Sequence, residues 1–145
     1  MLRPVTARTR GVLVALLVVY ALTLAFIAFW PTHVDEGAGH VLAAITLRFP
    51  WATYARIEFS ANIALFAPFG FLLAGLVRAW GWVIAIGVAS SAAIELIQGT
   101  LLPGRTASAW DVIANSLGMV AGVVIALIWR SSSEHASARR APRAS

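Results

Sequence analysis

Four long apolar stretches dominate this sequence and limit what it can fold into. They are Gly11–Trp30, Phe59–Val77, Gly81–Gln98 and Trp110–Trp129. A helix needs about 20 mostly apolar residues to cross a bilayer, and each stretch has roughly that length. Of the 145 residues, 60% are hydrophobic and 12% are charged, whereas about 25% of a typical soluble domain is charged. The sequence therefore predicts an all-α membrane protein with four transmembrane helices and short loops.

The two ends of the chain lead to different predictions. The first apolar stretch is longer than a typical signal-peptide core and no small-x-small cleavage site follows it, so we expect an uncleaved first span. Residues 131–145, "SSSEHASARRAPRAS", are small, polar and basic, and such segments bury too little apolar surface to order themselves. We therefore predict one transmembrane domain over residues 1–130 and a disordered basic cytoplasmic tail over residues 131–145.

Arginine placement predicts the orientation of the spans, because inner loops of membrane proteins are enriched in basic residues. With the N-terminus inside, the inner segments hold Arg3, Arg8, Arg10, Arg78, Arg130, Arg139, Arg140 and Arg143, whereas the outer segments hold Arg48, Arg56 and Arg105. Tryptophan belts at the two interfaces agree with this topology: Trp30, Trp51 and Trp110 on the outer side, and Trp80, Trp82 and Trp129 on the inner side. Both termini are thus predicted to be cytoplasmic.

The segment Pro31–Glu58 is the longest predicted loop. Four of its apolar residues recur near helical spacing: Val41, Leu42, Ile45 and Phe49. They fit either a short helix on the outer membrane surface or an apolar loop packed on the bundle. His33 and His40 have no partner at metal-site spacing, so we expect solvated histidines and no metal.

The acids and amides of the spans gather at their outer ends. They form three pairs at helical spacing, Glu58 with Asn62, Glu95 with Gln98, and Asp111 with Asn115. Residues three or four apart share one face of a helix. Ionisable groups inside a membrane default to a functional hypothesis. We therefore expect an outward-facing polar site where three spans meet, with Arg105 contributing from the loop between the last two.

Small and helix-bending residues accompany this cluster. Gly118 and Gly122 continue the face of Asp111 and allow another helix to approach closely, while Pro68 and Gly70 interrupt the second span. Purely structural interpretations also fit the same residues. Ser108-x-x-Asp111 matches a helix capping box, the glycines can serve packing alone, and Pro68 can be a simple kink.

Several kinds of chemistry stay open for such a site. Its carboxylates could bind a cation or relay protons, hold a zwitterionic or phosphate-bearing headgroup together with Arg56 and Arg105, or act as a general base. The chain has no Cys and no His within the spans, so no nucleophile–base pair is evident and catalysis is less favoured. No cofactor is indicated. The net charge of +5 comes from tails and turns, which argues against nucleic-acid binding.

The motifs around these residues resemble the VanZ-like family, which is named after a teicoplanin-resistance accessory protein. The resemblance rests on "NIALFAPFGFLLAGL" from Asn62, "IELIQ" from Ile94, "GR" at Gly104–Arg105 and "DVIANSLGMVAG" from Asp111. The matching motif residues are Asn62, Phe66, Pro68, Gly70, Glu95, Gln98, Arg105, Asp111, Asn115 and Gly118.

This resemblance implies a multi-pass protein of the bacterial cytoplasmic membrane. It further implies a role in glycopeptide resistance or envelope homeostasis. The expected partners are membrane lipids and a lipid-linked envelope precursor or glycopeptide. Whether the protein forms an oligomer is left open. The alternatives are a membrane enzyme acting on a lipid-linked substrate, a small transporter, and a structural partner protein.

Overall fold

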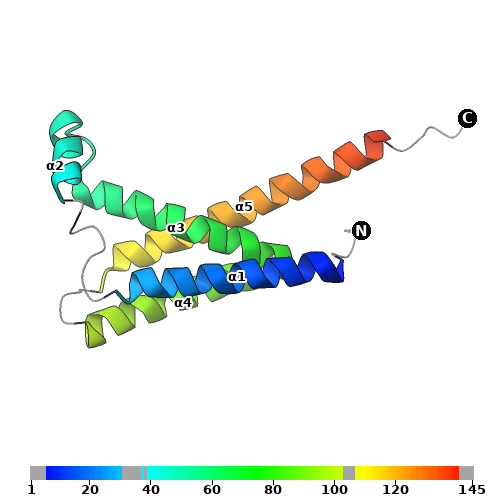
Figure 1. The fold of residues 1–145 in the computed structure, drawn as a ribbon, viewed down its shortest axis with the longest axis horizontal. Coiled ribbons are helices and arrows are strands. Elements are labelled where there is room, and N and C mark those ends of the chain that lie inside the picture. Colours follow the sequence, from blue (N-terminus) through cyan, green and yellow to red (C-terminus); the bar gives the residue numbers. More distant parts are fainter. Residues whose placement is uncertain (1–5, 31–36, 38, 103–106, 141–145) are drawn as a thin grey trace, which may run out of the picture.

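The chain folds into helices joined by short connections, as a computed structural model shows (Figure 1). The structure describes residues 6–30, 37, 39–102 and 107–140, with the backbone alone for 134–140. Within these residues there are five helices: α1 (Ala7–Ala28), α2 (Gly39–Arg48), α3 (Tyr54–Leu76), α4 (Trp80–Leu101) and α5 (Ala109–Arg140). Four of them, all except α2, are long and apolar enough to cross a membrane. The prediction of an all-α protein with four spans is confirmed.

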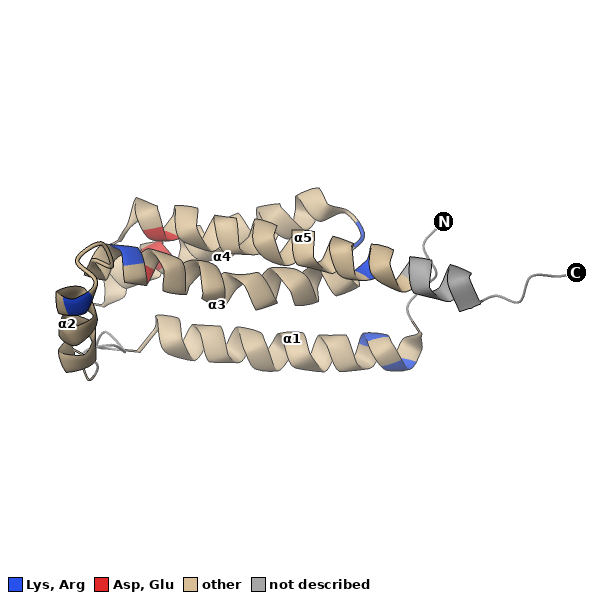
Figure 2. Cartoon of the chain, turned by 90° about the horizontal axis from the view of Figure 1, so that it is seen from above, with Lys and Arg blue, Asp and Glu red and all other residues tan. Residues whose placement is uncertain are grey.

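The long helices run between two ends of one bundle (Figure 1). At the end that carries α2, called the α2 end below, α1 and α4 finish and α3 and α5 begin. At the opposite end, called the terminal end, α1 begins and α5 finishes (Figures 1 and 2). Consequently α3 and α5 run parallel to each other, and α4 runs antiparallel to both.

The last helix extends further than the sequence indicated. We predicted a disordered tail from Ser131, but α5 continues to Arg140. The hydroxyls of Ser131 and Ser132 both donate to the carbonyl of Ile128, so they are satisfied inside the helix. Pro142 is the first proline after the span, and the residue before a proline avoids helical geometry. The boundary at Ser131 is therefore corrected, and residues 141–145 lie outside the described residues.

The closest packing in the bundle is the parallel contact of α3 with α5. A β-carbon added at Gly118 would lie 2.5 Å from the carbonyl oxygen of Ile63 and 2.8 Å from the β-carbon of Phe66. One added at Gly70 would lie 2.5 Å from the carbonyl oxygen of Met119. These neighbours are mostly backbone atoms, which cannot rotate away. Gly118, one of the two glycines predicted to allow close approach, and Gly70 therefore bring the two helices nearly into backbone contact.

Met119 is the centre of the apolar core below the polar residues. Its side chain is fully buried and fills the space beside Gly87 of α4. The buried cluster around it contains Phe66, Leu73, Ala74, Val83, Val123 and Ala126. The core thus joins α3, α4 and α5, with α5 between the other two.

The first helix is attached by fewer contacts, and two of them are hydrogen bonds. The Tyr20 hydroxyl donates to the Leu65 carbonyl of α3 over 2.8 Å. The Gln98 side-chain nitrogen of α4 donates to the Ala28 carbonyl over 2.8 Å. Ala28 is the last residue of α1, where carbonyls lack partners within the helix. Most of the remaining α1 surface is apolar and exposed, as expected for a face in contact with lipid.

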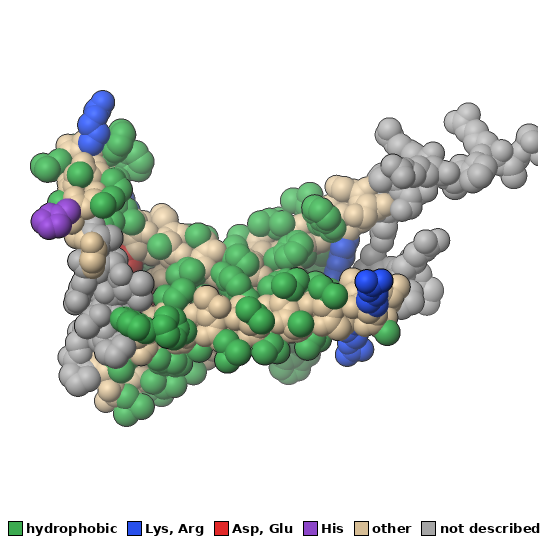
Figure 3. Space-filling view, in the orientation of Figure 1, with side chains coloured by type: hydrophobic (Ala, Val, Ile, Leu, Met, Phe, Trp, Pro, Cys, Tyr) green, Lys and Arg blue, Asp and Glu red, His purple; other side chains and the backbone are tan. Residues whose placement is uncertain are grey.

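The expected short helix in the loop after the first span is present as α2. It lies at the edge of the bundle and none of its residues is buried (Figure 3). Val41 and Leu47 are exposed, and so are Phe49 and Trp51 just after it. His40 is also on the surface. The existence of the helix is established, and its contact with the membrane surface stays a prediction.

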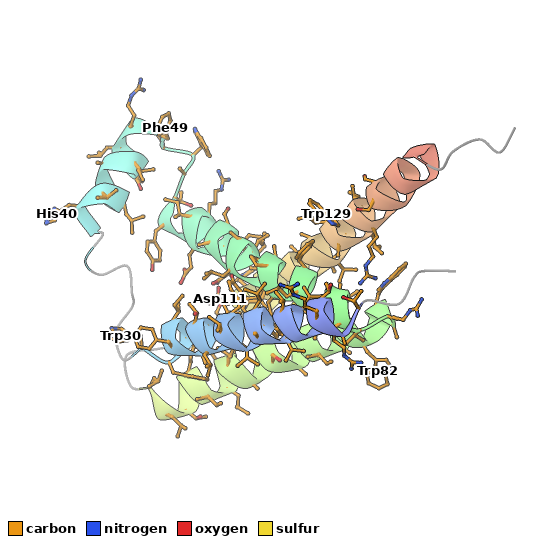
Figure 4. All side chains as sticks on the ribbon, turned by 45° about the vertical axis from the view of Figure 1, so that its right-hand side comes forward. Trp30, His40, Phe49, Trp82, Asp111 and Trp129 are labelled. Atoms are coloured by element: carbon orange, nitrogen blue, oxygen red, sulfur yellow. The ribbon has the colours of Figure 1, made fainter. Side chains whose placement is uncertain are left out.

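Aromatic and basic side chains mark both ends of the bundle. Trp30 lies at the α2 end, while Trp82 and Trp129 lie toward the terminal end (Figure 4). Among the arginines whose side chains are described, those at the terminal end are Arg8, Arg10, Arg78 and Arg130, and those at the α2 end are Arg48 and Arg56 (Figure 2). Arg130 of α5 donates to the Ala74 carbonyl near the end of α3, where a cation complements the helix dipole.

Candidate functional site

The acidic residues of the four spans lie at the α2 end of the bundle (Figure 2). They are Glu58 of α3, Glu95 of α4 and Asp111 of α5. Glu95 is buried at 7% exposure, and the other two are half-buried. A carboxylate facing lipid would be costly, so placing these groups between helices is the arrangement that the bilayer favours. The predicted gathering of acids at one end is what the structure shows.

The contact between α4 and α5 fixes the relative heights of their polar residues. The Asn115 side-chain nitrogen donates to the Ser91 hydroxyl over 2.9 Å, and this pair is buried. Four residues further along α5, Met119 packs on Gly87, which is four residues earlier in α4. Moving one turn in the other direction along both antiparallel helices places Asp111 level with Glu95.

The parallel contact between α3 and α5 fixes the third helix. Gly118 packs against Ile63 and Ala67, and the rings of Phe59 and Trp110 have centroids 6.4 Å apart. This register places the first pair of α3, Glu58 and Asn62, at the levels of Asp111 and Asn115.

The polar residues therefore form two levels one helical turn apart. We call Glu58, Glu95 and Asp111 the carboxylate layer. Asn62, Ser91 and Asn115 form the amide layer beneath it, and the apolar core around Met119 follows.

Glu95 has a structural partner that the sequence did not indicate. Its Oε2 accepts a hydrogen bond from the Ser108 backbone N–H over 2.7 Å. Ser108 caps α5, because its hydroxyl accepts from the Asp111 backbone N–H over 3.3 Å. In a complete capping box the third helical residue would receive the Ser108 N–H. Here Glu95 from the neighbouring helix receives it, so one carboxylate ties the end of α4 to the start of α5.

The other predicted site residues take different positions. Gln98 is buried and bonds to α1, so its nitrogen holds the helices together. Asn62 is half-buried at the level of Asn115.

Pro68 is exposed, and α3 passes through it as one continuous helix. Arg105 and His33 lie outside the described residues. Arg56 is exposed and donates to the Trp51 carbonyl.

Asn115 carries the least expected feature of the site. Its side chain is 4% exposed, and its Oδ1 atom is buried without a hydrogen-bond partner in the described part of the chain. Buried polar side-chain atoms are normally satisfied. Sequence spacing marked Asn115 as a site residue, but the open acceptor follows from how α4 packs.

The chemistry available here is that of oxygen acceptors. The carboxylate layer supplies negative charge, and the amide layer supplies a buried carbonyl oxygen. Within the described residues, no group of three or more His, Asp or Glu is placed to hold a metal ion. The arrangement is therefore suited to accept hydrogen bonds from a donor or a cation.

A family model described as VanZ/LLP1 matches residues 12–130, which include most of the first and fourth spans and all of the two between them. The chain belongs to the VanZ/LLP1 family. This confirms the resemblance drawn from the sequence motifs. Together with the four spanning helices it identifies a multi-pass membrane protein. No curated protein and no solved structure gives a match.

Proposed function

We propose that this VanZ-family protein acts at the outer face of the bacterial cytoplasmic membrane, with both termini in the cytoplasm. Its carboxylate and amide layers would engage a component of the cell envelope, either a lipid-linked precursor or headgroup or a glycopeptide of the teicoplanin type. Through that contact the protein would contribute to glycopeptide resistance or envelope homeostasis. The observation that carries the proposal is the confinement of the acids of the four spans to the α2 end, between packed helices (Figure 2).

The orientation is supported by the described arginines. Arg8, Arg10, Arg78 and Arg130 at the terminal end outnumber Arg48 and Arg56 at the α2 end, which favours a cytoplasmic terminal end. A transporter has less support than a binding site. Below the amide layer the space between the helices is filled by Met119, Val123 and their neighbours, and the described side chains form no continuous polar path there.

The orientation gives a first test, because the chain has no Cys. Thr100 near the α2 end and Gly81 near the terminal end are both exposed. In intact cells, a membrane-impermeant maleimide is expected to label Thr100→Cys and to label Gly81→Cys only after permeabilisation. The reverse pattern would place the carboxylate layer in the cytoplasm and contradict the proposal.

Asp111→Asn gives a test of function. Asparagine keeps the size of the side chain and removes its charge, and losing a helix-dipole contact of this kind costs only about 0.5 kcal/mol. In cells expressing the protein at matched levels, we expect this variant to lose most of its effect on teicoplanin susceptibility or on an envelope-stress reporter.

Thr100→Ala is the matched control for Asp111→Asn. Thr100 lies near the same end, and its hydroxyl bonds only to carbonyls of its own helix, at Leu96 and Ile97. It should behave as the wild type. Equal activity of Asp111→Asn and Thr100→Ala would count against a functional carboxylate layer.

A further inference from the structure

The Oδ1 atom of Asn115 is a buried acceptor for which the described chain supplies no donor. The amide nitrogen of the same side chain donates to the Ser91 hydroxyl, which leaves Oδ1 as the atom without a partner. Leaving a buried acceptor unsatisfied destabilises the folded protein. An unpartnered oxygen at the centre of three packed helices points to a donor brought by a ligand.

The direction of Asn115 connects it to the carboxylate layer. Side chains on a helix lean toward its N-terminus, and α5 begins at the α2 end. Asn115 therefore leans toward the level of Asp111 and Glu95. The two layers are four residues apart, or about 6 Å along the axis. The proposed ligand would therefore lie between the two layers.

Two donors near the site already have partners within the protein. Gln98 donates to Ala28, and the Ser108 N–H donates to Glu95. A carboxylate can accept several hydrogen bonds at once, so a carboxylate with a partner inside the protein can also accept one from a ligand. The site thus combines acceptors and negative charge.

A primary ammonium group matches these properties. It carries three N–H donors and one positive charge, and its hydrogen bonds to carboxylates are charge-assisted. A metal ion is less suited, since the described acids are not placed to hold one. We propose that the site binds a primary ammonium group between the carboxylate layer and Asn115 Oδ1. This inference rests on the proposed function and names the chemistry that the envelope component presents.

Two sources can present this group, an aminophospholipid headgroup in the outer leaflet and a water-soluble amine. Phosphatidylethanolamine and phosphatidylcholine separate the chemistry cleanly, because methylation removes the N–H donors and keeps the charge. The full chain is purified in detergent with equal amounts of both lipids, and the lipid that stays bound is counted by native mass spectrometry. We expect about tenfold preference for phosphatidylethanolamine, since a hydrogen bond to a charged group contributes about 1.5 kcal/mol or more.

The soluble source is tested by thermal unfolding of the same preparation in phosphatidylcholine alone. A higher melting temperature in ethylammonium chloride than in tetramethylammonium chloride or sodium chloride would support a water-soluble amine. Asn115→Leu should remove either preference. Ser116→Ala is the control and should retain it, because the Ser116 hydroxyl bonds to the Val112 carbonyl of its own helix. If Asn115→Leu fails to fold, the headgroup comparison on the wild type still decides.

Equal retention of the two lipids, together with equal effects of the three salts, would overturn the ammonium site. So would a preference that survives Asn115→Leu, or stabilisation by sodium that matches ethylammonium. If the wild type shows no ammonium preference while Asp111→Asn loses function as predicted, this inference alone is refuted. Ammonium binding with full function in Asp111→Asn would refute the proposed function instead.

Discussion

Replacing Gly122 with alanine is expected to lower the free energy of unfolding by about 3 kcal/mol, the upper range for overpacking a tight interior. The added β-carbon would collide with the carbonyl oxygen of Ala67 and lie 2.6 Å from the backbone nitrogen of Phe71. Backbone atoms cannot rotate aside, so α3 and α5 would have to separate. Thermal unfolding in detergent, followed by tryptophan fluorescence, measures the loss.

Two other glycines turn this into a graded series. At Gly81 an added β-carbon meets nothing within 4 Å, so Gly81→Ala should be neutral or slightly stabilising. At Gly87 the three atoms nearest to the added carbon belong to the Met119 side chain, which can adopt another rotamer. Gly87→Ala should therefore fall between the other two. An unchanged melting temperature for Gly122→Ala would contradict the close contact of α3 with α5.

Glu95→Leu is expected to destabilise the protein by about 2 kcal/mol, because it leaves the Ser108 backbone N–H without its acceptor. Glu95→Gln should cost less than about 1 kcal/mol, since its amide oxygen can accept the same bond. The two variants separate the structural role of Glu95 from its charge. Thermal unfolding of the two purified variants measures this difference, and equal losses would show that Ser108 does not depend on Glu95.

The spans followed from the sequence because length and apolar composition alone determine them. Their partners did not, since a lipid-facing helix is apolar on nearly every side and no stripe marks its contact face. Tyr20 shows the difficulty. It sits inside the first apolar stretch, and its bond to Leu65 depends on how α1 lies across α3. The close approach at Gly118 and Gly122 was the one packing contact that the sequence predicted.

The sequence predicted the candidate site about as far as it predicted the spans and their packing. Helical spacing placed Asp111 with Asn115 and Glu95 with Gln98 on common faces, and the Ser108 cap was evident from the residue types. The partners of Glu95 and Gln98 required the three-dimensional register, because Ser108 is on another helix and Ala28 is 70 residues away. The helical extension of α5 was missed because a polar composition says little about a segment continuous with a stable helix.

The proposed function depends most on the charge of Glu95, which must have a role beyond holding α4 to α5. The direct test is the effect of Glu95→Gln on teicoplanin susceptibility or envelope stress per folded molecule. The expression level is measured in the same cells, and the melting temperature on the protein purified from them. We predict nearly complete loss of the effect with folded protein close to the wild-type level. Wild-type activity in Glu95→Gln would show that the carboxylate is a structural group and contradict the proposed site.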